Sequence, residues 1–260
     1  MTSLPFDRAV SYYDRTREMP DEIARDGIQA LLDRLQAHRY AHILEVGAGT
    51  GRISIPLLER GAQLVGVDLS RPMLRRQLEK YPAARVAQAD AIDLPFANAY
   101  FDGLLTIHVL HLVGAWRVAL REFARVLKPG GVYVNSWNWH ADNDVDARVR
   151  AHWRASVEAQ GGSWRRPGIQ SREQLLIEVR DMGAAVEELT VVRFFPAVSP
   201  GEVVESIAER VFSDTWDIPD DIFDASVREL RAWASETFGD VTKPLMVERR
   251  FLLDVVRFRR

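Results

Sequence analysis

The chain of 260 residues contains no cysteine, which excludes disulfides, thiolate metal sites and cysteine nucleophiles together. It also lacks a run of about 18 apolar residues, so no membrane-spanning helix is predicted. The opening residues, MTSLPFD, have neither the basic nor the apolar region of a signal peptide. The net charge of −3 at pH 7 leaves no global field that would attract nucleic acid or an anionic membrane. We therefore expect a cytoplasmic protein without such partners, and the sequence leaves its oligomeric state open.

Three common site signatures are missing as well. No Gly-Lys-Ser/Thr follows a glycine-rich turn, so a P-loop is excluded. No pair of histidines stands with an acid at the spacing that metal sites use, so no metal is expected. The one glycine-rich turn reads G-x-G-x-G at Gly47, Gly49 and Gly51, and Arg52 stands where a dinucleotide-binding turn has its third glycine.

The glycine-rich turn connects an apolar strand to a helical pattern. Residues 41–46 form the expected strand, and a helix is expected over about 50–60. A Cβ at Gly47 or Gly49 would obstruct a ligand or forbid a positive φ angle. The first turn of the following helix directs free N–H groups at whatever lies beyond the strand. The turn therefore predicts a site where a ligand touches backbone.

A carboxylate, Asp68, ends the next apolar strand, which is expected over about 62–67. One carboxylate can accept hydrogen bonds from both the 2′ and the 3′ hydroxyl of a ribose. The alternative is a helix N-cap, although Ser70 is better placed to cap the helix that contains Pro72. Ligands of open α/β sheets bind beyond the carboxyl ends of the strands, so Asp68 and the glycines together predict a nucleoside cofactor.

With its acid, Glu45, before the glycines, this segment resembles the first motif of class I S-adenosylmethionine-dependent methyltransferases of the small-molecule type. Four later segments resemble the family's motifs in the same order. The resemblance covers roughly residues 40–136. It implies methyl transfer from S-adenosylmethionine to an oxygen, nitrogen or carbon atom of a small molecule by in-line displacement. The four segments are 66–70 (GVDLS), 90–96 (DAIDLPF), 101–106 (FDGLLT) and 125–131 (RVLKPGG).

The resemblance also implies the roles of residues around the nucleoside. Asp90 would accept from the adenine amino group, and the N–H of Ala91 would bind a ring nitrogen. Leu69 and Met73 would pack against the adenine ring, with a role in the core as the alternative. The full set of predicted cofactor-binding residues is Tyr13, Arg17, Glu45, Gly47, Ala48, Gly49, Arg52, Asp68, Leu69, Met73, Asp90, Ala91 and Thr106.

The resemblance also implies partners for the methionine end of the cofactor. Glu45 and the carbonyl of Thr106 would bind the amino group. Arg17 and Arg52 compete for the carboxylate, which either would hold by a charge-assisted pair. Tyr13 would close the pocket from the N-terminal segment, where the alternative is a solvated helix face.

The sequence does not fix the general base. His108 and His111 come directly after the fourth strand and are weak candidates for removing a proton from the acceptor, with ring packing as the alternative. Two rival functions stay open. An NAD(P)-binding oxidoreductase is disfavoured by the missing third glycine. A non-enzymatic S-adenosylmethionine-binding sensor is not excluded, because methyl transfer demands no particular residue.

Alternating strands and helices predict a doubly wound α/β fold. By the family resemblance we expect a mostly parallel, seven-stranded sheet with an antiparallel last strand and a helical cap. The cofactor-binding half, with a helix over 7–38, would end at residue 136. The tryptophans beyond it would serve packing or an aromatic cage. Within 137–260, strands are expected at about 186–195 and 247–258, and a substrate cap at about 137–182 and 197–238.

Overall fold

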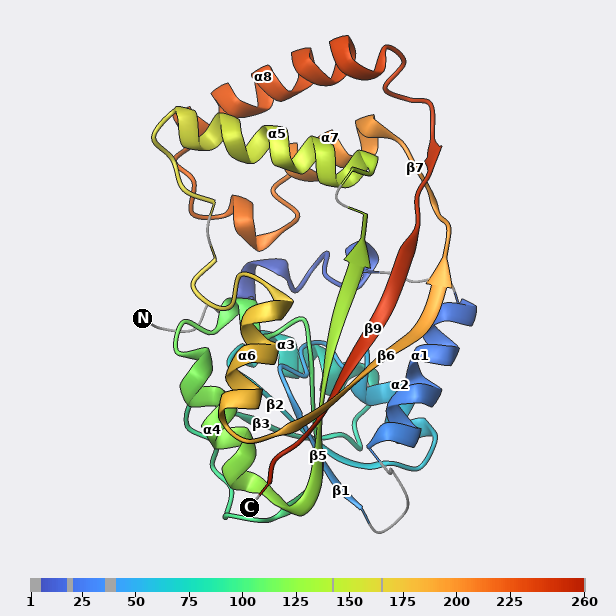
Figure 1. Cartoon of the computed structure of the whole chain (residues 1–260), viewed down its shortest axis with the longest axis vertical. Helices are drawn as coiled ribbons and strands as arrows, with labels where there is room; N and C mark the ends of the chain where they lie inside the picture. The colour runs from blue at the N-terminus through green and yellow to red at the C-terminus, as the bar shows by residue number, and fades with distance from the viewer. Residues whose placement is uncertain (1–5, 18–20, 36–40, 142, 165, 260) are drawn as a thin grey trace. The chain divides into compact units, whose positions relative to one another are not determined.

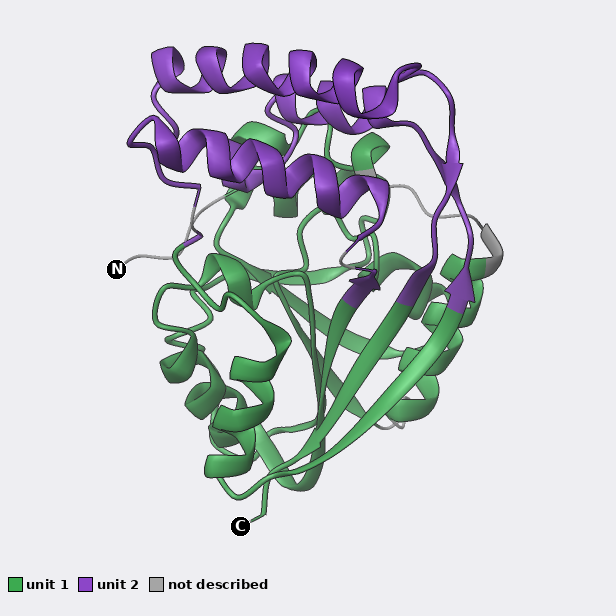
Figure 2. Cartoon of the chain, turned by 45° about the horizontal axis from the view of Figure 1, so that its top comes forward, with its two compact units in different colours: residues 1–137, 167–192, 251–260 green, residues 138–166, 193–250 purple. Residues whose placement is uncertain are grey.

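The computed structural model describes residues 6–17, 21–35, 41–141, 143–164 and 166–259. The chain divides into two compact units, which Figure 2 colours separately. Unit 1 comprises residues 1–137, 167–192 and 251–260, and unit 2 comprises residues 138–166 and 193–250. We describe each unit by itself.

Unit 1 is built on a seven-stranded sheet in the order β3-β2-β1-β4-β5-β9-β6 (Figure 1). The pairs β1–β2, β1–β4, β2–β3 and β4–β5 are parallel. In Figure 1, β9 runs down to the C-terminus whereas the arrow of β5 points up, so the last strand is antiparallel, as predicted. The strands are β1 (His42–Val46), β2 (Gln63–Asp68), β3 (Arg85–Gln88), β4 (Phe101–Ile107), β5 (Leu127–His140), β6 (Ala185–Phe194) and β9 (Arg249–Arg257).

Helices cover both faces of this sheet, which makes the fold doubly wound. Helices α4 and α6 pack against one face of the sheet in one hydrophobic core, and α1 and α2 pack against the opposite face in a second core. In α4, Trp116, Ala119, Leu120, Phe123 and Val126 are all buried because they recur every three or four residues. The helices of unit 1 are α1 (Asp21–Arg34), α2 (Ser54–Glu59), α3 (Arg71–Lys80), α4 (Trp116–Val126) and α6 (Arg172–Asp181), with 3-10 turns η1 (Asp7–Ala9), η2 (Arg15–Arg17) and η3 (Leu110–Leu112).

Unit 2 is a small helical unit with its own core. Trp153 and Leu230 are fully buried there, and the Trp153 Nε1–H donates to Ser226 Oγ at 3.2 Å. The guanidinium of Arg154 lies 4.3 Å from the Trp164 ring centroid. These contacts favour packing over an aromatic cage, while a substrate-covering role of the unit stays a prediction. Its elements are α5 (Val145–Ala159), α7 (Pro200–Ala208), η4 (Ser213–Thr215), α8 (Asp220–Phe238) and the antiparallel pair β7 (Ala197–Val198) and β8 (Leu245–Met246).

The structure differs from the sequence prediction at three places. The helix expected over about 50–60 is α2, which begins only at Ser54. The helix expected over 7–38 is instead two 3-10 turns followed by α1. Asp14 lies between them and accepts hydrogen bonds from Thr50 and, at 3.0 Å, from Lys80, so tertiary contacts shape this segment. The fifth strand continues to His140, beyond the predicted end at residue 136. None of the helices in the described ranges is long and apolar enough to cross a membrane.

Candidate functional site

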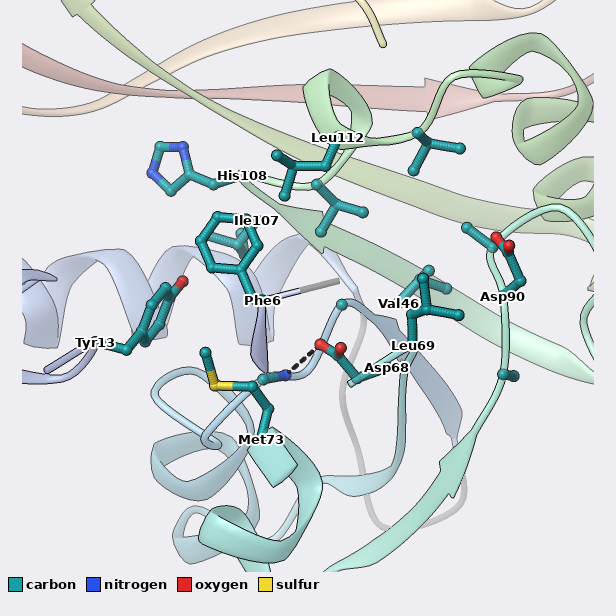
Figure 3. Close-up of a pocket in the computed structure, with 16 residues that line it drawn as sticks. Phe6, Tyr13, Val46, Asp68, Leu69, Met73, Asp90, Ile107, His108 and Leu112 are labelled. Atoms are coloured by element: carbon teal, nitrogen blue, oxygen red, sulfur yellow. Dashed lines mark hydrogen bonds between the residues drawn. The ribbon is translucent and has the colours of Figure 1, made fainter. Parts of the chain in front are cut away.

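A pocket lies in unit 1 at the carboxyl ends of β1, β2 and β4 (Figure 3). The strand order places these three ends side by side, since β1 pairs with both β2 and β4. Figure 3 shows Asp90 at one end of the pocket, and Tyr13, Phe6 and His108 towards the other. Of the predicted cofactor contacts, Tyr13, Gly47, Gly49, Asp68, Leu69, Met73, Asp90 and Ala91 line it.

The glycine turn has the left-handed backbone that the sequence predicts. Gly47 has φ +78° and Gly49 has φ +56°. A Cβ on Gly47 would lie 2.2 Å from Val109 Cγ2, whereas a Cβ on Gly49 would meet nothing nearer than 4.0 Å. Glycine is therefore required at position 47 because Val109, in the chain that follows β4, occupies the space of a side chain. The space beside Gly49 is open to a ligand. Gly51 serves packing, because its Cβ would lie 2.7 Å from Gln77 Cγ.

Asp68 holds the turn in place from the end of β2. Its Oδ2 accepts from the Gly49 N–H at 2.8 Å, drawn as a dashed line in Figure 3, and its Oδ1 accepts from the Ser70 N–H at 2.8 Å. Burial raises the pKa of the Asp68 carboxyl, and these two backbone hydrogen bonds oppose that rise. A carboxylate has about four acceptor positions, so about two remain for the hydroxyls of a ribose. The arrangement fits a nucleoside.

The residues predicted to hold adenine all line the pocket, although Figure 3 shows Met73 on the side of Asp68 nearer to Tyr13 and Asp90 at the other end. Leu69 and Met73 line the pocket beside Asp68, and Ser70 caps α3 by accepting from the Met73 N–H at 3.2 Å. Asp90 Oδ1 accepts from the Ile92 N–H at 3.3 Å, which turns the chain so that both Asp90 and Ala91 line the pocket. An apolar slot ending in a carboxylate suits a flat ring that carries an amino group.

We expect Asp90→Ala to weaken S-adenosylhomocysteine binding by about 1–2 kcal/mol, because the adenine amino group loses one acceptor. Isothermal titration calorimetry measures the change. Asp93→Ala is the matched control, since Asp93 is exposed and does not line the pocket. Equal losses in the two variants would contradict the assignment of Asp90.

Glu45 lies in β1 beneath the turn, and the lining of the pocket does not include it. Its side chain is fully buried and accepts a hydrogen bond from Ser54 Oγ. Burial raises the pKa of Glu45 to about 8, while Ser54 and the charge of Arg52 partly offset that rise. The carboxyl is therefore protonated at neutral pH in the folded protein without its cofactor, and its contact with the methionine amino group stays a prediction.

The raised pKa of Glu45 predicts how stability depends on pH. Between pH 4.5 and about 8 the folded protein keeps a proton that the unfolded chain releases, so the free energy of unfolding falls as pH rises through this window. Glu45→Gln removes the effect. Urea titrations measure the free energy of unfolding of the parent and of the variant at each pH. We expect the parent's value, relative to that of the variant, to be lower by about 2 kcal/mol at pH 7 than at pH 5. If the unfolding free energies of the parent and of Glu45→Gln changed in parallel with pH, the raised pKa would be contradicted. Glu59→Gln, on the exposed end of α2, is the control.

Five other predicted residues are not placed in the pocket. Ala48 is buried, and its N–H donates to the Val67 carbonyl at 3.0 Å. Thr106 is buried, with its Oγ1 2.8 Å from Tyr133 Oη, and the role of its carbonyl stays a prediction. Arg52 lines a different cavity. His111 does not line the pocket, and the side chain of Arg17 lies outside the described part of the chain.

Sequence reasoning missed the aromatic and apolar residues that complete the lining. Phe6 packs edge-on against Tyr13, with ring centroids 6.0 Å apart. Ile107 ends β4, and Val109, Leu112 and Val113 come from the chain after it. The enclosed volume is about 80 Å³, below the roughly 300–1,000 Å³ of small-molecule sites.

His108 stands apart among the lining residues because its backbone is strained. Its φ of +58° is left-handed, and such angles in residues other than glycine concentrate at functional sites. The predicted candidate His108 is therefore at the pocket, whereas the other candidate, His111, is not.

Comparisons with known proteins agree with this architecture. Residues 44–135 match the family described as a methyltransferase domain. The chain is 33% identical over 153 residues to a malonyl-[acyl-carrier protein] O-methyltransferase of Enterobacter lignolyticus, covering 59% of this chain and 58% of that protein. It is 37% identical over 139 residues to a demethylmenaquinone methyltransferase of Clavibacter sepedonicus, covering 51% and 56%.

Among solved structures, the YcgJ protein of Bacillus subtilis superposes with a TM-score of 0.60 at 16% identity, covering 89% of this chain and 98% of that one. This likeness establishes the fold alone. The chain spans a little over half of the length of the two curated relatives, at 58% and 56%.

Proposed function

We propose, from the premise that this chain carries a class I S-adenosylmethionine-dependent methyltransferase domain, that it transfers a methyl group from this cofactor to a small molecule. The observation that carries the proposal is Asp68 at the end of β2. Its two oxygens each accept one backbone N–H at 2.8 Å, and the residue lines the pocket, so acceptor positions not used by the backbone would be available to a ribose. The same residue thus shapes the glycine turn and offers a ribose its partner.

In this proposal the chain mainly binds and orients. Bound S-adenosylmethionine supplies a methyl group already activated on a sulfonium. Asp68 would hold the ribose, Asp90 would hold the adenine amino group, and the open face of Gly49 would let the ligand touch backbone. Holding an acceptor about 3 Å from the methyl carbon, in line with the departing sulfur, supplies several kcal/mol of the barrier reduction.

His108 is the side chain that we assign to proton removal from an oxygen or nitrogen acceptor. It lines the pocket, and Figure 3 shows it away from the end that carries Asp90. A histidine is suited to this step because its charge changes near neutral pH. Tyr13 also lines this part of the pocket and would close it over the cofactor.

The acceptor is proposed only as a class. The two relatives are named for different acceptors, a malonyl-[acyl-carrier protein] and demethylmenaquinone, so they do not single one out. The net charge of −3 disfavours a nucleic acid. We therefore propose a small-molecule acceptor, and a reaction in the cytoplasm.

Two measurements test the proposal. S-adenosylhomocysteine should bind in calorimetry and NAD should not, and tight binding of NAD alone would overturn it. Labelled S-adenosylmethionine incubated with a metabolite extract should then yield a labelled product.

His108→Gln should lower the rate of labelling and leave the Kd of S-adenosylhomocysteine unchanged. Binding without labelling in any of a broad set of extracts would favour a sensor instead.

A further inference from the structure

Unit 1 contains a second cavity, of about 410 Å³. This volume falls within the range of roughly 300–1,000 Å³ that small-molecule sites occupy. The residues that line it and those that line the nucleoside pocket have no member in common. Ile28, Leu31 and Ile53 of its wall belong to the core around α1 and α2, whereas Val46 and Val113 of the nucleoside pocket belong to the core on the other side of the sheet, and Ile107 is the residue of that pocket that belongs to the α1 and α2 core. The second cavity is therefore a separate space.

The wall of the second cavity is largely apolar. Ala24, Ile28 and Leu31 contribute from α1, and Phe251 contributes from β9. Gly27 also lines it, and a Cβ there would lie 3.3 Å from Phe251 Cε1, so the small residues of α1 keep the space open. A closed cavity of about 150 Å³ lined only by leucine, isoleucine and phenylalanine stays free of water and takes up benzene, and the apolar part of this wall resembles such a lining. A larger apolar cavity is likewise better filled by an apolar ligand than by water.

The polar side chains of the cavity carry an excess positive charge. Lys80 is paired with Asp14 at 3.0 Å, and these two charges cancel. Arg52 is the other charged residue of the described lining, and its Nε is buried without a hydrogen-bond partner among the described residues. Glu45 interacts electrostatically with Arg52, but burial raises its pKa to about 8, so its carboxyl is mostly uncharged at pH 7. One cation is thus left facing an apolar space.

We propose that this second cavity binds an aliphatic monocarboxylate, with its chain between α1 and α2 and its carboxylate on Arg52. One negative charge balances the excess charge, and the carboxylate supplies the acceptor that Arg52 Nε lacks. If benzene in about 150 Å³ sets the scale, the cavity holds up to about 16 non-hydrogen atoms. A medium-chain fatty acid has this size.

Octanoate is the probe, and 1-octanol is the uncharged ligand of the same length. We expect octanoate to bind the full chain at one site in calorimetry, and octanol to bind at least tenfold more weakly because it lacks the charge that Arg52 meets. Octanoate should bind equally well when S-adenosylhomocysteine is saturating. Absence of octanoate binding, equal affinity for octanol, or displacement by S-adenosylhomocysteine would each overturn the proposal.

Two pairs of variants locate the site. Ala24→Phe fills the cavity and should abolish octanoate binding, whereas Gln29→Phe, on the exposed face of the same helix, should not. Arg52→Met should weaken octanoate about tenfold or more, whereas Arg60→Met, at the exposed end of α2, should leave it unchanged. Binding of S-adenosylhomocysteine by the Ala24→Phe protein reports that it is folded. Octanoate binding that survives both Ala24→Phe and Arg52→Met would place the ligand elsewhere and contradict the proposal.

Discussion

Replacing Asp68 with alanine is expected to weaken S-adenosylhomocysteine binding by about 2–4 kcal/mol, which is roughly 30- to 1,000-fold. Two ribose hydroxyls would lose a charged acceptor. The Gly49 and Ser70 N–H groups, each held at 2.8 Å, would lose theirs as well, so the turn itself would loosen. Calorimetry gives the change in Kd, and an unchanged Kd would refute the role of Asp68.

The variant Asp68→Asn separates the two contributions to this loss. It keeps one acceptor oxygen, so one of the two backbone N–H groups can still be held, but it carries no charge. We expect its affinity to lie between those of the parent and Asp68→Ala. A urea titration of each variant without ligand reports how far the loosened turn lowers the free energy of unfolding. Loss of ligand binding that simply follows loss of folding would argue for a structural role alone.

Gly47→Ala should destabilise the folded protein by about 2–5 kcal/mol and abolish detectable S-adenosylhomocysteine binding. About 1–2 kcal/mol comes from forcing a residue with a Cβ into a left-handed backbone, here at φ +78°. About 1–3 kcal/mol comes from overpacking, because the new Cβ would lie 2.2 Å from Val109 Cγ2. A urea titration measures the loss of stability as a fall in the free energy of unfolding. Calorimetry measures the loss of S-adenosylhomocysteine binding.

The chain offers a matched control for the backbone cost. Gly61 has φ +87°, and a Cβ there would meet nothing within 4 Å, so Gly61→Ala should cost about 1–2 kcal/mol. Adding Val109→Ala to Gly47→Ala removes the clash, and the double variant should be more stable than Gly47→Ala alone. If Gly47→Ala costs no more than Gly61→Ala, contact with Val109 does not explain the glycine.

The sequence predicted the cofactor side of the sheet well because its signals are local. One strand is followed directly by Gly47 and Gly49, and the next strand ends in Asp68. In each case a few neighbouring residues are enough to predict the local geometry. The seven-stranded sheet with an antiparallel last strand, which was expected from the family resemblance, was also confirmed. The segment 7–17 was predicted as helix and is two 3-10 turns, because contacts of Asp14 with Thr50 and Lys80, far away in the sequence, decide its shape.

The candidate site was predictable at its polar positions and not at its apolar ones. Asp68, Asp90 and Met73 stand at fixed places in family-like segments, and all three line the pocket. Phe6 and Leu112 also line it, but a lone phenylalanine or leucine carries no motif. Arg52 was predicted as a cofactor contact from its position beside the glycines; it lines the second cavity, and its contact with the cofactor stays a prediction.

The aromatic end of the nucleoside pocket has a kinetic consequence. Phe6 and Tyr13 line a pocket of about 80 Å³, which is smaller than a nucleoside, so we expect the entry and exit of a nucleoside-sized molecule to displace these side chains. Such gating steps limit the pace of many enzymes. Release of S-adenosylhomocysteine would then limit the steady-state rate. A rapid burst of methylated product would precede the slower steady state.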